Sequence, residues 1–153
     1  MLDKPTNELD EMLSDMKPER LEDFYKENGE YMADGDRPFY NYMKSVLREK
    51  GIRHKDLYIR ADMTESYGQQ ILSMDKHTKN RDLILSLCLA GHFSIIETNR
   101  ALKLYGFTEL YAKDKRDVCI MAAINARKFE LSDVDELLEE HGFEKLKRNT
   151  NEE

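Results

Sequence analysis

The chain has 153 residues, of which 40% are hydrophobic and 36% charged, and its net charge is −7. This length and composition suit one compact domain, or a small domain with an appendage, beneath a heavily charged surface. No apolar run reaches the roughly 20 residues that a transmembrane helix needs, and the amino-terminal residues lack the basic and apolar regions of a signal peptide. Few prolines and glycines favour helices over strands. We therefore expect an all-α, cytoplasmic protein with no membrane contact.

The spacing of apolar residues predicts a series of short helices. Two lie in an acidic amino-terminal arm, residues 1–36, over residues 6–16 and 18–28. The others are expected over residues 39–50, 55–61, 65–73, 80–90, 94–105, 115–126 and 132–141. We assign residues 37–92 to one domain, residues 93–147 to a helical extension packed on it, and residues 148–153 to a disordered tail.

Local residues mark several helix ends. Ser94 and Glu97 have the spacing of a capping box, and Ser132 is expected to cap the last helix. The pattern L-x-x-x-G-F-x-x-L occurs twice, around Gly106 and Gly142. It predicts a helix closed by a left-handed glycine, with the Phe folded back onto the last turn. Because many helices end this way, we interpret the pattern as a shared helix ending and not as a repeat architecture.

Charge is distributed unevenly along the chain. Residues 1–36 carry 4 basic and 12 acidic side chains, residues 37–92 carry 10 and 6, and residues 93–153 carry 10 and 13. Only the middle segment is therefore positive. Its balance of +4 suits a polyanionic partner, with chance clustering on a charged surface as the alternative.

The middle segment also carries a family resemblance. Leu57 lies in the predicted helix 55–61, Met63 and Thr64 form the turn after it, and Ile71 lies in the helix 65–73. In this order, residues 43–91 resemble the lambda-repressor-like (Xre-family) helix-turn-helix proteins. The resemblance implies five short helices, of which the second and third form the helix-turn-helix and the third lies in the DNA major groove.

Four residues depart from the family pattern. Tyr58 replaces a small Ala, Asp62 stands where the turn glycine would be, Gly68 replaces a buried Ile or Val, and Met74 replaces the glycine after the third helix. Residues 94–124 are similar to a tail carried by some bacterial helix-turn-helix proteins. The resemblance thus implies an all-α, lambda-repressor-like helix-turn-helix bundle with amino- and carboxy-terminal helical extensions.

The resemblance implies two sets of DNA-contacting residues. Base edges would be met by Glu65, Ser66, Gln69 and Gln70, since Gln can bind adenine with two hydrogen bonds and Glu can accept one from cytosine. Phosphates would be met by Arg53, Lys55, Thr64, Lys76, Lys79 and Arg81. For each basic residue, a solvated surface charge is the alternative.

The sequence carries no pattern typical of catalysis or of a cofactor site. Its four histidines lack metal-ligand spacing, and no phosphate loop or nucleophile motif occurs. Cys88 and Cys119 lie in apolar helical patterns, so we interpret both as buried free thiols. We therefore expect no cofactor, no metal and no enzymatic activity.

Two functions remain. The first is a DNA-binding transcriptional regulator, acting as a homodimer on a pseudo-palindromic site. The second is a protein-interaction or adaptor module that keeps the helix-turn-helix fold without reading DNA. The second is motivated by the departures at Tyr58, Gly68 and Met74 and by the acidic residues 1–36, which could repel DNA or fold back over the basic face as an autoinhibitory arm.

Overall fold

The computed structural model describes residues 17–22 and 37–148. This part of the chain is helical, with no strand. The helix predicted over residues 6–16, most of the one over residues 18–28 and almost all of the predicted tail lie outside the described residues, apart from the 3₁₀ turn η1 (Pro18–Arg20). Among the described residues, none of the helices combines the length and hydropathy of a membrane span.

Each helix predicted from residue 39 onward is present, with bounds that differ from the prediction by at most one residue. The helices of this described part are α3 (Pro38–Lys50), α4 (His54–Arg60), α5 (Glu65–Leu72), α6 (Arg81–Ala90), α7 (Ile95–Tyr105), α8 (Lys115–Asn125) and α9 (Leu131–Glu140).

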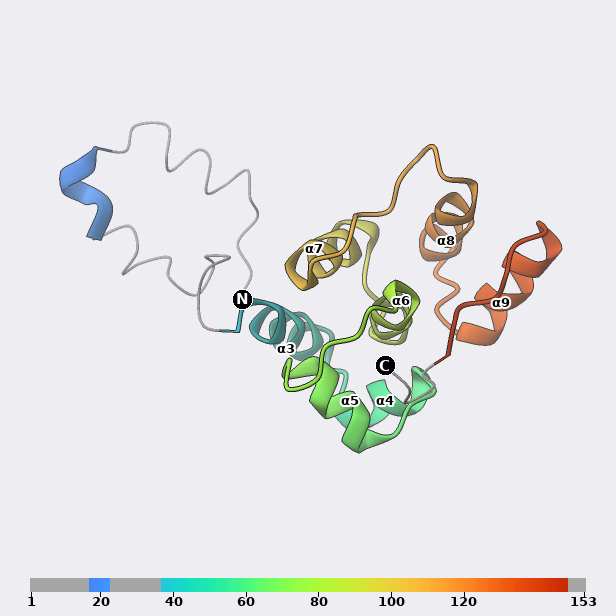
Figure 1. Cartoon of the computed structure of the whole chain (residues 1–153), viewed down its shortest axis with the longest axis horizontal. Helices are drawn as coiled ribbons and strands as arrows, with labels where there is room; N and C mark the ends of the chain where they lie inside the picture. Colours follow the sequence, from blue (N-terminus) through green and yellow to red (C-terminus); the bar gives the residue numbers. More distant parts are fainter. Residues whose placement is uncertain (1–16, 23–36, 149–153) are drawn as a thin grey trace.

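Helix α6 forms the centre of the described bundle (Figure 1). Every residue of α6 after its first is buried, and α4, α7 and α9 pack against it. A helix that is buried on all sides must be enclosed by other elements. One hydrophobic core runs from Phe39 to Leu146, so the boundary predicted between residues 92 and 93 falls inside that core.

The two L-x-x-x-G-F segments end their helices as predicted. Gly106 and Gly142 have φ angles of 105° and 81°, in the left-handed region that glycine adopts without strain. The Phe107 N–H donates to the Leu102 carbonyl at 2.8 Å, and the Phe143 N–H makes the equivalent bond at 2.9 Å. Each Phe therefore folds back onto the last turn of its helix.

The two predicted amino-terminal caps have different outcomes. The capping box is confirmed, because the Glu97 N–H donates to Ser94 Oγ at 3.1 Å and the Ser94 N–H donates to Glu97 Oε1 at 2.9 Å. The predicted Ser132 cap is wrong. Helix α9 begins one residue earlier, at Leu131, and Glu130 occupies the cap position without a side-chain hydrogen bond.

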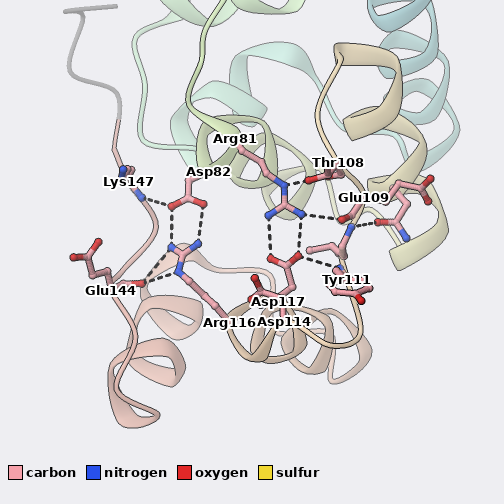
Figure 2. Close-up of polar contacts among 12 residues, drawn as sticks. Arg81, Asp82, Thr108, Glu109, Tyr111, Asp114, Arg116, Asp117, Glu144 and Lys147 are labelled. Carbon is pink, nitrogen blue, oxygen red and sulfur yellow. Dashed lines mark hydrogen bonds and ion pairs between the residues drawn. The ribbon is translucent and has the colours of Figure 1, made fainter.

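Crossed ion pairs join the first turns of α6 and α8 (Figure 2). Arg81 donates to both carboxylate oxygens of Asp117 at 2.9 and 3.0 Å, and Arg116 donates to both oxygens of Asp82 at 3.0 and 2.8 Å. Asp82 and Asp117 are buried, and both arginines are only partly exposed. The first residue of each pair thus binds the second residue of the other pair: Arg81 binds Asp117, and Arg116 binds Asp82.

The chain after α9 runs back toward α4 (Figure 1) and is fixed by the same kind of contact. The Lys147 N–H donates to Asp82 at 2.9 Å, and Arg148 binds both Asp135 of α9 and Asp62, which follows α4. The carboxy-terminal part of the described chain is therefore tied to the start of α6 and to the turn between α4 and α5.

Candidate nucleic-acid interface

Helix α5 has one buried and one exposed side. Thr64 caps it by accepting a hydrogen bond from the Tyr67 N–H at 3.2 Å. The buried side consists of Tyr67, Gly68, Ile71 and Leu72, and the exposed side consists of Glu65, Ser66, Gln69 and Gln70. Because residues four apart lie above one another on a helix, these four exposed residues share one solvent-facing surface. They are the four predicted base contacts, and we call this surface the polar face of α5.

A close contact with α4 holds the buried side of α5. Gly68 lies against the ring of Tyr58, and a Cβ added at Gly68 would be 2.3 Å from Tyr58 Cδ1. Tyr58 is only 1% exposed, so its ring fills the space between the two helices. The two departures from the family pattern therefore compensate for each other. The large side chain of Tyr58 on α4 packs into the space that is free because Gly68 on α5 has no side chain.

The turn between α4 and α5 keeps the backbone shape that the sequence analysis expected. Asp62, which stands where the family pattern has glycine, has a φ of 60°, in the left-handed region that Asp tolerates. The Met63 N–H then donates to the Tyr58 carbonyl at 3.1 Å, which closes the end of α4. Met74, after α5, is also left-handed at a φ of 69°, although it carries a full side chain.

Four of the predicted phosphate-binding cations are exposed, two at the start of the α4–α5 pair and two in the segment after it. Lys55, at the start of α4, and Lys79, before α6, are exposed and form no ion pair within the described part of the chain. Arg53 is 81% exposed and pairs with Asp56 at 3.1 Å. Lys76 Nζ lies 5.3 Å from the centre of the Tyr67 ring, a cation–π contact that holds this lysine beside α5.

Arg81 has a different role from the predicted phosphate contact. Its guanidinium binds Asp117 through two nitrogens and donates to the carbonyls of Thr108 and Glu109, both at 3.1 Å (Figure 2). These bonds occupy every nitrogen of the guanidinium. We therefore remove Arg81 from the candidate interface and assign it to the junction between α6 and α8.

A groove of about 410 Å³ borders the polar face of α5. Tyr40 and His54 line it together with Ser66, Gln69 and Gln70. Burial lowers the pKa of His54, and the nearby charge of Lys44 lowers it further. Sequence analysis missed Tyr40 and His54, since no local motif marks them and they join this surface only through the packing of α3 and α4.

The described residues contain no cluster of His, Cys, Asp and Glu side chains suited to a metal ion. Both cysteines are free thiols. Cys88 is buried as predicted, and burial raises the pKa of its thiol. Cys119 is only partly buried, which corrects the prediction, because α8 leaves one side toward solvent.

Comparison with known proteins finds no matching family model, no matching curated protein and no matching solved structure.

Proposed function

We propose that this protein is a DNA-binding regulator, in which α4 and α5 form a lambda-repressor-type helix-turn-helix and α5 enters the major groove. The observation that carries the proposal is the polar face of α5. Four side chains able to bind base edges share one exposed surface, while the opposite side of the helix is anchored against Tyr58. An α-helix presented in this way fits the width of the major groove.

The polar face provides different kinds of base contact at its two ends. Gln69 and Gln70 each offer a donor and an acceptor, the combination that binds adenine through two hydrogen bonds. Ser66 can donate or accept, and Glu65 can accept from the amino group of cytosine. The face is therefore suited to a site in which adenine contacts contribute most of the discrimination.

Phosphate contacts would come from the cations around α5. Lys55 and Lys79 are exposed without ion pairs in the described chain, and Lys76 is held beside α5 by Tyr67. Arg53 would exchange its exposed pair with Asp56 for a phosphate, an exchange of small cost because exposed pairs contribute little. Thr64 places the amino-terminal N–H groups of α5 at the same surface.

The direct test is a fluorescence titration of the full chain against a random duplex library, followed by the selected duplex, at several salt concentrations. We expect affinity to fall as salt rises, because bound lysines release counterions from DNA. Gln70→Ala should alter the preferred base at one position, and Lys79→Ala should weaken binding to all sequences alike. Lys103→Ala is the matched control, since this exposed lysine lies on α7, which Figure 1 places apart from α5. Absence of selection, or binding insensitive to salt, would contradict the proposal.

A second copy of the chain is the partner that a palindromic DNA site requires. An apolar groove of about 430 Å³ between α8 and α9 is suited to it, with Val118 43% exposed at its edge. Lys113 and Lys115 border the groove, and the exposed side of α9 is acidic, so a two-fold arrangement would bring opposite charges together. Val118→Glu should dissociate the dimer in sedimentation equilibrium, whereas Ile96→Glu, at an 80% exposed site on α7, should not. A monomeric native chain would contradict this assignment.

The adaptor function is the second candidate, and Glu65 is the observation that favours it. This carboxylate lies exposed in the first turn of α5, where a phosphate backbone would approach. Glu65→Gln separates the two functions. In a regulator, the side-chain oxygen of Gln can still accept from cytosine while repulsion of the phosphates is removed, so DNA binding should be kept or strengthened. In an adaptor, the same change should weaken the complex with a protein partner that pairs with Glu65.

A further inference from the structure

A second cavity, distinct from the groove beside the polar face of α5, lies where α4, the α6–α7 link and the start of α9 meet. Its volume is about 580 Å³, and its lining includes Ile59, Arg60, His92, Phe129 and Glu130. We propose that this cavity binds a small organic monocarboxylate with an apolar body, held by Arg60 and His92. The proposal concerns a ligand site of its own and does not depend on DNA binding.

The cationic side of the cavity has donors with no protein partner. Arg60 makes no ion pair or hydrogen bond within the described residues. Arg127 does not line the cavity and lies over the ring of Phe129, 5.4 Å from its centre. An arginine fork is the protein group best matched to a carboxylate, which it can bind through two parallel hydrogen bonds.

His92 is fixed beside these arginines. Its ring stacks on Phe129 with the centres 4.7 Å apart, so Phe129 positions both His92 and Arg127. Burial lowers the pKa of His92, and the positive charges of Arg60, Arg127 and Lys50 lower it further. Lys50 is already paired with Glu97 at 3.0 Å, and Arg148 is paired with Asp62 and Asp135, whereas Arg60 forms no ion pair within the described residues.

The remaining lining restricts the ligand. Ile59 is 67% exposed, and with Phe129 it provides an apolar wall that a ligand body would cover. Asp62 is engaged by Arg148, but Glu130 is an acidic lining residue without an ion pair in the described chain. A second negative charge on the ligand would be repelled by Glu130, so a monoanion with an apolar body suits the cavity better than phosphate.

The probes are benzoate and hexanoate, with inorganic phosphate and benzyl alcohol as comparators, each titrated into the full chain without DNA and followed by NMR. We expect both carboxylates to shift the His92 and Ile59 signals and to bind at least about tenfold more tightly than either comparator, since the charge-assisted bond and the apolar contact act together. Arg60→Gln should weaken carboxylate binding about tenfold, and Arg60→Lys should weaken it less. Arg48→Gln removes the same charge from an exposed site on α3 and should leave binding unchanged.

Carboxylate binding that persists unchanged in a folded Arg60→Gln chain would overturn the assignment. Tighter binding of phosphate than of benzoate would overturn the argument from Glu130. Because Arg60 ends α4 and Asp62 lies in the turn before α5, benzoate should also change the affinity for a selected DNA duplex. The effect on DNA affinity rests on the proposed function. Because the titration without DNA tests the ligand site alone, it distinguishes a failure of that site from a failure of the proposed function.

Discussion

Tyr58 and Gly68 form a matched pair across the contact between α4 and α5, because the ring of Tyr58 occupies the space where a side chain at residue 68 would lie. The distance of 2.3 Å from an added Cβ to Tyr58 Cδ1 is too short for any real contact. Tyr58 is only 1% exposed, so its ring is enclosed by the neighbouring side chains. The pair therefore fixes how closely α4 approaches α5, and with it the position of the polar face.

This pair predicts that the effect of Gly68→Ala on stability reverses when the ring of Tyr58 is removed. In a native background we expect a loss of about 1–2 kcal/mol in the free energy of unfolding, since overpacking outweighs the gain in helix propensity. In a Tyr58→Leu background, which removes the ring, the same change should stabilise by up to about 1 kcal/mol. Urea denaturation of the four chains measures both values. Equal effects in the two backgrounds would show that the ring does not restrict residue 68.

The crossed ion pairs predict a second set of stability changes. Asp82→Asn and Asp117→Asn should each lower the free energy of unfolding by about 2–3 kcal/mol, because each leaves a partly buried guanidinium without its carboxylate. Asp56→Asn, in the exposed pair with Arg53, is the matched control and should cost about 0.5 kcal/mol or less. Hydrogen exchange gives a further distinction, since only Asp82→Asn should expose the Lys147 amide, which Asp82 binds directly. Similar small costs for all three variants would contradict a structural role for the crossed pairs.

The helices could be predicted from the sequence because their signals are local. A cap, a terminating glycine and the apolar spacing all lie within a few residues, as at Ser94 and Gly106. The Ser132 cap was mispredicted because Leu131 is buried in the core as the first residue of α9, which puts Glu130, a residue poorly suited to capping, at the cap position.

The contents of the candidate site were harder to predict because they depend on distant residues. The residues next to Arg81 in the sequence indicate a surface charge in a basic segment, because its partner Asp117 lies 36 residues away. Tyr58 and Gly68 could be recognised as departures from a family pattern, but their compensation appears only when α4 and α5 are placed together. The four residues of the polar face, by contrast, were named by the resemblance to the lambda-repressor-like family, and the structure shows all four exposed.

Met74 and Asp62, two of the left-handed residues that are not glycine, predict unequal gains in stability on glycine substitution. Met74→Gly should stabilise the protein by about 1 kcal/mol, because a side chain at a φ of 69° carries a steric cost that glycine lacks. Asp62→Gly should gain less, since Asp tolerates this conformation and its carboxylate pairs with Arg148 at 3.2 Å. Thermal unfolding of both variants, with Met74→Ala as the control that keeps the steric cost, measures the difference. A loss of stability in Met74→Gly would mean that the methionine side chain contributes more than its backbone costs.

The two histidines with lowered pKa values predict separable pH responses. A histidine whose folded pKa lies below 6.5 favours its neutral form, so its contribution to stability is complete above about pH 6.5 and is lost as the pH falls through the folded pKa. Burial is the main cause for both rings, but His92 is also lowered by Arg60, whereas His54 is lowered by Lys44. Arg60→Gln should therefore raise the pKa of His92 and leave that of His54 unchanged, and Lys44→Gln should do the reverse. NMR titration of the imidazole signals in both variants checks this, and a variant that moves both pKa values together would show that the two sites are not electrostatically separate.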